Sequence, residues 1–84
     1  MKYRLVYTRR AERDVIKLES STKDRIGKNL LRYSEEPLRF AEKLSDPNLG
    51  EYRFRIGDYR VIFDIEGNDI LVLRVGHRRE ICKR

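Results

Sequence analysis

The chain has 84 residues, with 20 Lys and Arg against 14 Asp and Glu, one His and one Cys. This length predicts a single domain over residues 1–84 with one thin core, and the net charge of +6 predicts a polyanionic partner. One cysteine excludes an internal disulfide framework, and so few His and Cys residues argue against a zinc site. We find no spanning apolar run and no signal peptide, so we expect a cytoplasmic protein with no membrane partner.

The chain begins with a predicted strand and a predicted helix. Apolar and polar residues alternate over 3–7, which is typical of a half-buried strand. Thr8 is a suitable N-cap for a helix over about 9–18, whose apolar residues recur at helical spacing.

A second helix is expected over about 22–35. Ser21 and Asp24 have the spacing of a capping box, and Pro37 disfavours helix in the residue before it. Only two or three polar residues separate the two helices, which predicts an antiparallel helix hairpin.

The second half of the chain predicts three consecutive strands. They follow a connection that holds one short turn of helix near 40–44 and ends in a loop. The strands are expected at 51–56, 59–66 and 70–75, joined by turns at Gly57-Asp58 and at Gly67-Asn68-Asp69.

These elements predict an α+β fold with two layers, in the order β-α-α-β-β-β. The helix hairpin packs on one face of a small, mostly antiparallel sheet. We expect no element to cover the other face, so that face is the predicted functional surface.

The first turn determines which residues share a face. A two-residue turn at Gly57-Asp58 places Arg55 directly opposite Arg60, with Arg53 on the same face. Like charges in this arrangement destabilise a sheet unless an anion lies between them, and guanidinium groups suit phosphate oxygens. The opposite, helix-facing side is expected to carry Tyr52, Phe54, Ile56, Tyr59, Val61 and Phe63.

The second turn determines the position of Arg74. A three-residue turn would place Leu71, Leu73 and Val75 in the core and Arg74 on the arginine-bearing face, whereas a two-residue turn would bury Arg74. We expect the three-residue turn, with Arg78 and Arg79 following the last strand.

Two segments carry a resemblance to a known family. Residues 52–62 read Y-R-F-R-I-G-D-Y-R-V-I, and residues 75–81 read V-G-H-R-R-E-I. Together with the helix hairpin and Glu42-Lys43-Leu44, they resemble the RelE branch of the RelE/ParE toxin superfamily over nearly the whole chain.

The resemblance implies a compact fold with the first strand beside the last. It implies the toxin of a type II toxin–antitoxin system, a metal-independent and ribosome-dependent endoribonuclease (an mRNA interferase). Such a toxin needs no cofactor and is neutralised by a RelB-like antitoxin, so the implied partners are that antitoxin, the ribosome and mRNA.

The resemblance also implies site residues. The basic catalytic positions of the family match Arg53, Arg55, Arg60 and Arg78, while Cys82 stands where relatives carry a Tyr. The chain stops two residues after Cys82, so we expect no C-terminal helix.

The chemistry of RNA cleavage assigns these residues roles. Arginines stabilise charge that develops on the phosphate, but they remain protonated and are poor bases. Histidine is the residue type whose ordinary pKa lies nearest neutrality, so His77, beside Arg78, is the candidate acid or base. The predicted catalytic residues are Arg55, Arg60, His77 and Arg78, the predicted RNA-binding residues are Arg53, Arg74 and Arg79, and no metal ligands are predicted.

Two other functions remain open from the sequence. A ParE-like inhibitor of DNA gyrase has the same fold and cuts no RNA. A catalytically decayed toxin that only binds its antitoxin is favoured by Cys82 and the short tail. A general RNA-binding domain ranks last, because the exposed aromatic residues that stack on bases are missing.

Overall fold

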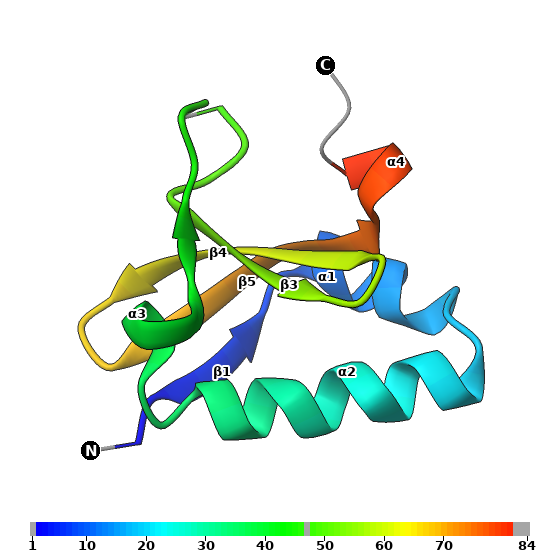
Figure 1. Cartoon of the computed structure of the whole chain (residues 1–84), viewed down its shortest axis with the longest axis horizontal. Helices are drawn as coiled ribbons and strands as arrows, with labels where there is room; N and C mark the ends of the chain where they lie inside the picture. Colours follow the sequence, from blue (N-terminus) through cyan, green and yellow to red (C-terminus); the bar gives the residue numbers. More distant parts are fainter. Residues whose placement is uncertain (1, 47, 82–84) are drawn as a thin grey trace.

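The computed structural model describes residues 2–46 and 48–81 of the chain. A five-stranded sheet has the strand order β1-β5-β4-β3-β2, and α2 runs beneath it (Figure 1). The elements are β1 (Arg4–Tyr7), α1 (Arg9–Ile16), α2 (Ser20–Tyr33), α3 (Pro37–Phe40), β2 (Glu42–Lys43), β3 (Tyr52–Ile56), β4 (Tyr59–Glu66), β5 (Asp69–His77) and α4 (Arg78–Ile81).

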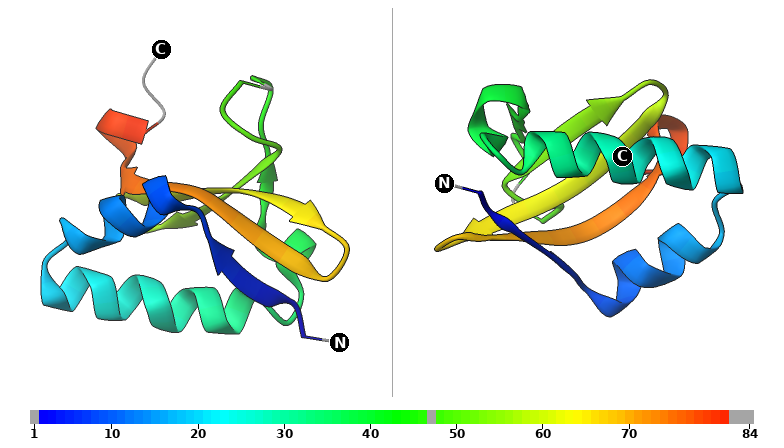
Figure 2. Two further views of the ribbon diagram at one scale, coloured as in Figure 1. Left: turned by 180° about the vertical axis from the view of Figure 1, so that it is seen from behind. Right: turned by 90° about the horizontal axis from the view of Figure 1, so that it is seen from below.

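The first strand lies beside the last, as the resemblance implies. β1 pairs with β5 in parallel, whereas all other neighbouring strands are antiparallel. β1 ends at Tyr7, and α1 continues beside β5 (Figure 2). Thr8 joins them, because its backbone N–H donates to the Val72 carbonyl and its hydroxyl donates to the Leu73 carbonyl.

The two predicted helix starts have different outcomes. The Ala11 N–H donates to the Thr8 hydroxyl at 3.1 Å, which confirms the Thr8 cap. The capping box at Ser21 is wrong, because α2 begins at Ser20 and its N-cap, Glu19, makes no side-chain capping bond. Ser21 therefore lies inside the first turn rather than before it.

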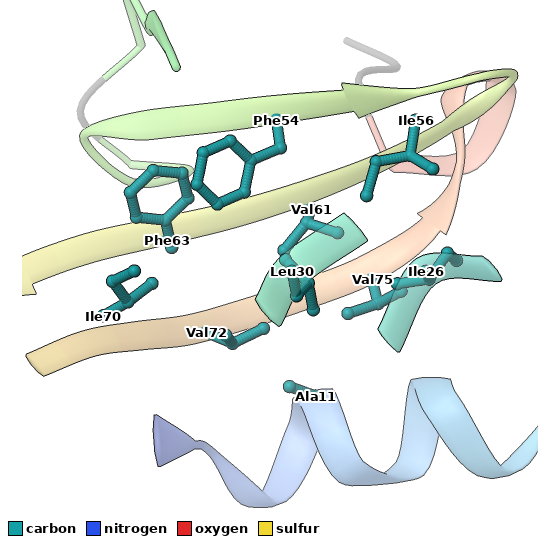
Figure 3. Packing of buried hydrophobic residues seen from close by; sticks show 10 residues of the cluster. All are labelled: Ala11, Ile26, Leu30, Phe54, Ile56, Val61, Phe63, Ile70, Val72 and Val75. Atoms are coloured by element: carbon teal, nitrogen blue, oxygen red, sulfur yellow. The ribbon is translucent and has the colours of Figure 1, made fainter. Parts of the chain in front are cut away.

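The core lies between the sheet and α2. Phe54 and Phe63 stack at 4.3 Å between ring centroids, and Leu30 and Ile26 of α2 face the strands (Figure 3). The predicted helix-facing set of β3 and β4 is confirmed, with Tyr52 and Tyr59 half-buried and the others buried.

The turn between β4 and β5 differs from its prediction. It has two residues rather than three, because Glu66 pairs with the first residue of β5. Ile70 and Val72 therefore lie in the core, and the core assignment of Leu71 and Leu73 is wrong.

A bulge then restores the predicted faces at the end of β5. The register shifts between Ile62 and Phe63, whose partners are Arg74 and Val72, so that Leu73 is the extra residue. A bulge exchanges the faces of the residues that follow it. Val75 is consequently in the core and Arg74 is on the other side, as predicted.

The face opposite α2 is only partly uncovered, which corrects the prediction. At one end the segment around Gly50 folds over it, where a Cβ on Gly50 would lie 2.7 Å from Ile62. At the other end α4 covers it, where a Cβ on Gly76 would lie 2.7 Å from Ile81. Figure 1 shows both segments on the same side of the sheet. The single turn of α4 precedes Cys82, and the expected absence of a helix after Cys82 concerns residues outside those described.

Candidate nucleic-acid interface

Four arginines from three adjacent strands lie in two neighbouring rows across the sheet. In one row Arg53 is opposite Ile62, which is opposite Arg74; in the next, Arg55 is opposite Arg60, which is opposite Gly76. The predicted pairing of Arg55 with Arg60 is confirmed. We call Arg53, Arg55, Arg60 and Arg74 the arginine face.

Glu42 contacts the two arginines of β3. Its Oε1 accepts from Nε of Arg53 at 2.8 Å, and its Oε2 accepts from Nη1 of Arg55 at 3.4 Å. The hydrogen bond from Arg53, with the charges of both guanidinium groups, lowers the pKa of Glu42 despite partial desolvation. The carboxylate is therefore ionised at neutral pH. This role could not be predicted from the sequence, because a two-residue strand is too short to show a periodic pattern.

Arg60 is buried, which the sequence did not predict. Its side chain is only 5% exposed, and its Nη1 donates to the carbonyls of Gly57 and Tyr59 at 2.9 Å each. Its neighbour in the row, Gly76, is covered by Ile81 of α4. Arg60 thus stabilises the β3–β4 turn at the end of the sheet that α4 covers.

Arg74 reaches α1 from β5. Its Nε lies 2.8 Å from a carboxylate oxygen of Asp14, and that oxygen also accepts from the Val75 N–H at 3.0 Å. Burial would raise the pKa of Asp14, but the hydrogen bonds from Arg74 and Val75 outweigh it and the pKa is lowered. Asp14 thereby fixes the position of Arg74.

His77 lies apart from Arg53 and Arg55. It is opposite Tyr59, whose ring packs against the core, and the two rings meet edge to face at 5.5 Å. His77 therefore belongs to the helix side of the sheet. Its Nδ1 accepts from the Arg79 N–H at 3.2 Å, so the neutral ring carries its proton on Nε2.

His77 and Arg74 still share a cavity. The cavity has a volume of about 460 Å³ and lies between the end of α1, β5 and α4. Asp14, Tyr59 and Glu80 also line it. The structure thus brings His77 near Arg74 and Arg79, two of the predicted RNA-binding residues, and places it on the other side of the sheet from Arg53.

Arg78 and Arg79 begin α4. The Arg78 N–H donates to the Asp58 carbonyl at 2.8 Å, and its half-exposed guanidinium lies 3.9 Å from the Asp58 carboxylate. This contact ties α4 to the same turn that Arg60 supports. The Arg79 side chain is exposed. Cys82 lies outside the described residues.

Two further observations concern the described part of the chain as a whole. None of its helices is long and apolar enough to cross a membrane. It holds no group of three or more His, Cys, Asp or Glu residues that could bind a metal ion.

Comparison with solved structures shows the same fold in type II toxins. The toxin–antitoxin complex RelBE2 from Mycobacterium tuberculosis matches with a TM-score of 0.83 and 30% identity, over 93% of this chain and 100% of that one. A free, doubly substituted RelE from E. coli matches with a TM-score of 0.75 and 26% identity, over 93% and 85%. The architecture is therefore RelE-like.

Sequence comparison leads to the same group of proteins. The toxin RelG of Mycobacterium tuberculosis is 33% identical over the full length of both chains. Residues 5–82 match the family described as the ParE toxin of the type II toxin–antitoxin system parDE. The chain belongs to this family and is a RelE-like toxin of a type II toxin–antitoxin system.

Proposed function

We propose that this toxin cleaves mRNA on the ribosome without a metal ion. The observation that supports the proposal is the arginine face, where three strands place four arginines on one side of a small sheet and the guanidinium groups of Arg53 and Arg55 share the Glu42 carboxylate. Positive charge concentrated in this way suits the RNA backbone, because phosphate contacts supply most of the affinity for nucleic acid.

Cleavage requires three tasks of this surface. The 2′-hydroxyl attacks the adjacent phosphate, the developing charge on that phosphate is stabilised, and the 5′-oxygen receives a proton. Arg53, Arg55, Arg74 and Arg79 would hold the backbone, with Arg55 nearest the scissile phosphate. Arg78, half-exposed at the β3–β4 turn, would stabilise the transition state, and the buried Arg60 would support it by holding that turn.

Proton transfer explains the proposed dependence on the ribosome. His77 is the candidate acid or base, yet it lies on the helix side of the sheet. An arginine is too weak an acid to replace it. A protein with this arrangement gains most from a substrate whose reacting atoms are already aligned, and the ribosome would supply that alignment.

The proposed partner is a RelB-like antitoxin. The similar RelBE2 toxin was solved in complex with its antitoxin. In this chain a largely apolar cavity of about 540 Å³ runs between α1 and α2. Ile16, which lines it, is 74% exposed. We propose that the apolar side of an antitoxin helix covers this groove.

Ribosomes stalled on a defined message test the nuclease. We expect wild-type toxin to produce new ends within the A-site codon, with 2′,3′-cyclic phosphate on the upstream fragment. Arg55→Gln should reduce cleavage by about 100-fold or more, since it removes a guanidinium from the reacting phosphate. Arg39→Gln, an exposed arginine of α3, is the matched control and should cleave normally.

The second candidate is inhibition of DNA gyrase, which the match to the ParE family favours. A supercoiling assay with purified gyrase distinguishes it. Inhibition by toxin that leaves stalled messages intact would replace the nuclease proposal with the gyrase proposal. If both assays are negative and antitoxin binding is intact, the chain is a decayed toxin.

A further inference from the structure

The carboxylate of Glu42 bridges the two arginines that β3 places on the arginine face. One of its oxygens lies 2.8 Å from Nε of Arg53, and the other lies 3.4 Å from Nη1 of Arg55. A phosphate can make the same contacts, because it too presents several oxygens to guanidinium donors. Glu42 therefore occupies a place that fits a phosphate.

The pairing of β2 with β3 creates this bridge. Glu42 is directly opposite Arg53, and Arg55 lies two residues further along the same face. The side chains of Glu42, Arg53 and Arg55 are 41%, 30% and 58% exposed. Ion pairs with this exposure contribute only about 0–1 kcal/mol each, so a polyanion can displace the carboxylate.

The other ion pair of the arginine face differs in this respect. The Asp14 side chain is 12% exposed and also accepts from the Val75 N–H. Displacing Asp14 would leave a buried backbone donor unpaired, at a cost of about 1–3 kcal/mol. Of these two carboxylates, only Glu42 is placed to exchange with an anion from solution.

We propose that Glu42 is an internal competitor for the phosphate of single-stranded RNA that Arg53 and Arg55 would hold. The choice of RNA as the ligand rests on the proposed function. An extended polyanion is favoured over a single carboxylate, because the whole chain carries a net charge of +6. Glu42 lowers the affinity for free RNA and leaves the site selective for a strand that is already held in position.

The test measures binding of a 2′-O-methylated single-stranded RNA, in which the attacking hydroxyl is blocked. Fluorescence anisotropy gives Kd between about 50 and 200 mM salt. Glu42→Gln should bind about three to five times more tightly than wild type, because the substitution removes the negative charge that competes with the phosphate. Its affinity should also fall more steeply with salt, since more phosphate contacts form.

Glu36→Gln is the matched control. It removes the same charge and breaks an exposed pair with Arg39 on α3. Its Kd should stay within about twofold of wild type. The gain from Glu42→Gln should also vanish when Arg55→Gln is added. Circular dichroism confirms that each variant is folded before its affinity is compared.

Three results would overturn the inference. Equal gains in Glu42→Gln and Glu36→Gln would show an effect of net charge alone. If Glu42→Gln still raised the affinity for RNA in a chain that also carries Arg55→Gln, the effect would not arise at Arg55. If Glu42→Gln bound the antitoxin more tightly but not RNA, the subsite would be assigned to an acidic protein segment. Because this RNA cannot be cleaved, a Glu42-dependent affinity in a toxin inactive on ribosomes would refute the nuclease and leave the subsite standing.

Discussion

At the scale of single residues, Arg60 combines a predicted catalytic role with a structural one. Its guanidinium is buried and donates to two carbonyls of the β3–β4 turn. Arg60→Ala should therefore lower the free energy of unfolding by about 1–3 kcal/mol, because those carbonyls lose a charged donor. Thermal and urea unfolding measure this change. If Arg60→Ala is as stable as wild type, the structural role is wrong, and a loss of toxicity would then reflect chemistry alone.

Asp14 is predicted to make stability depend on pH. Its pKa is held below the ordinary 3.8. A carboxyl group with a lowered pKa stabilises the fold above its ordinary pKa, and this contribution is lost as the pH falls through the folded value. Asp14→Asn should cost about 1–3 kcal/mol at neutral pH. Its difference from wild type should shrink below about pH 4.

Urea unfolding at neutral and acid pH measures both effects of Asp14→Asn. Asp24→Asn is the control, because Asp24 forms an exposed pair with Lys28 within α2. Its cost should stay below about 0.5 kcal/mol. A difference between Asp14→Asn and wild type that persists undiminished at about pH 3 would contradict the assigned role of the carboxylate.

At the scale of elements, the sequence predicted what depends on local pattern. Period-two alternation in β3 and β4 identified the core face, and the Gly57-Asp58 turn placed Arg55 opposite Arg60. The bulge at Leu73 was missed, because it depends on how β4 and β5 pair and not on the residues of either strand alone. The placement of Arg74 was correct only because the bulge compensates for a turn one residue shorter than predicted.

The elements that cover the arginine face were missed for a different reason. α4 is a single turn, and its position depends on a contact between Ile81 and Gly76 of β5. Nothing in the sequence around Ile81 or Gly76 predicts this contact. The burial of Arg60, in the same row as Gly76, was unpredictable for the same reason.

The position of α4 can be tested at Gly76. A Cβ there would lie 2.7 Å from Cγ1 of Ile81, so Gly76→Ala should displace α4 and cost about 1–3 kcal/mol. Hydrogen exchange should become faster at the Arg78 amide, which donates to Asp58. Gly27→Ala in α2 is the control, since no atom beyond the local backbone of its own helix lies within 4 Å of its Cβ position. It should stabilise the protein by about 0.5–1 kcal/mol.

At the scale of the whole molecule, the two proposed binding surfaces differ in both chemistry and position. The arginine face lies on the side of the sheet away from α2, whereas the apolar groove lies between α1 and α2. Substitutions in one surface should therefore leave binding at the other unchanged, because distant sites act independently. This separation allows the antitoxin contact to be tested without altering the site proposed for RNA.

Ile16→Glu tests the groove. The side chain is already 74% exposed, so the substitution should leave the melting temperature of the toxin nearly unchanged. It should weaken antitoxin binding by about 10- to 100-fold, because burial of an isoleucine contributes about 1.5–3 kcal/mol to a complex. Isothermal titration calorimetry with the cognate antitoxin measures the change.

Leu38→Glu is the control for Ile16→Glu, since Leu38 is 58% exposed on α3 and lies outside the groove lining. It introduces the same charge and should leave antitoxin affinity within about twofold of wild type. If the two variants weaken binding equally, charge rather than the apolar groove determines the contact. If neither does, the antitoxin docks elsewhere, and Ile16→Glu should then remain neutralised in cells that express both proteins.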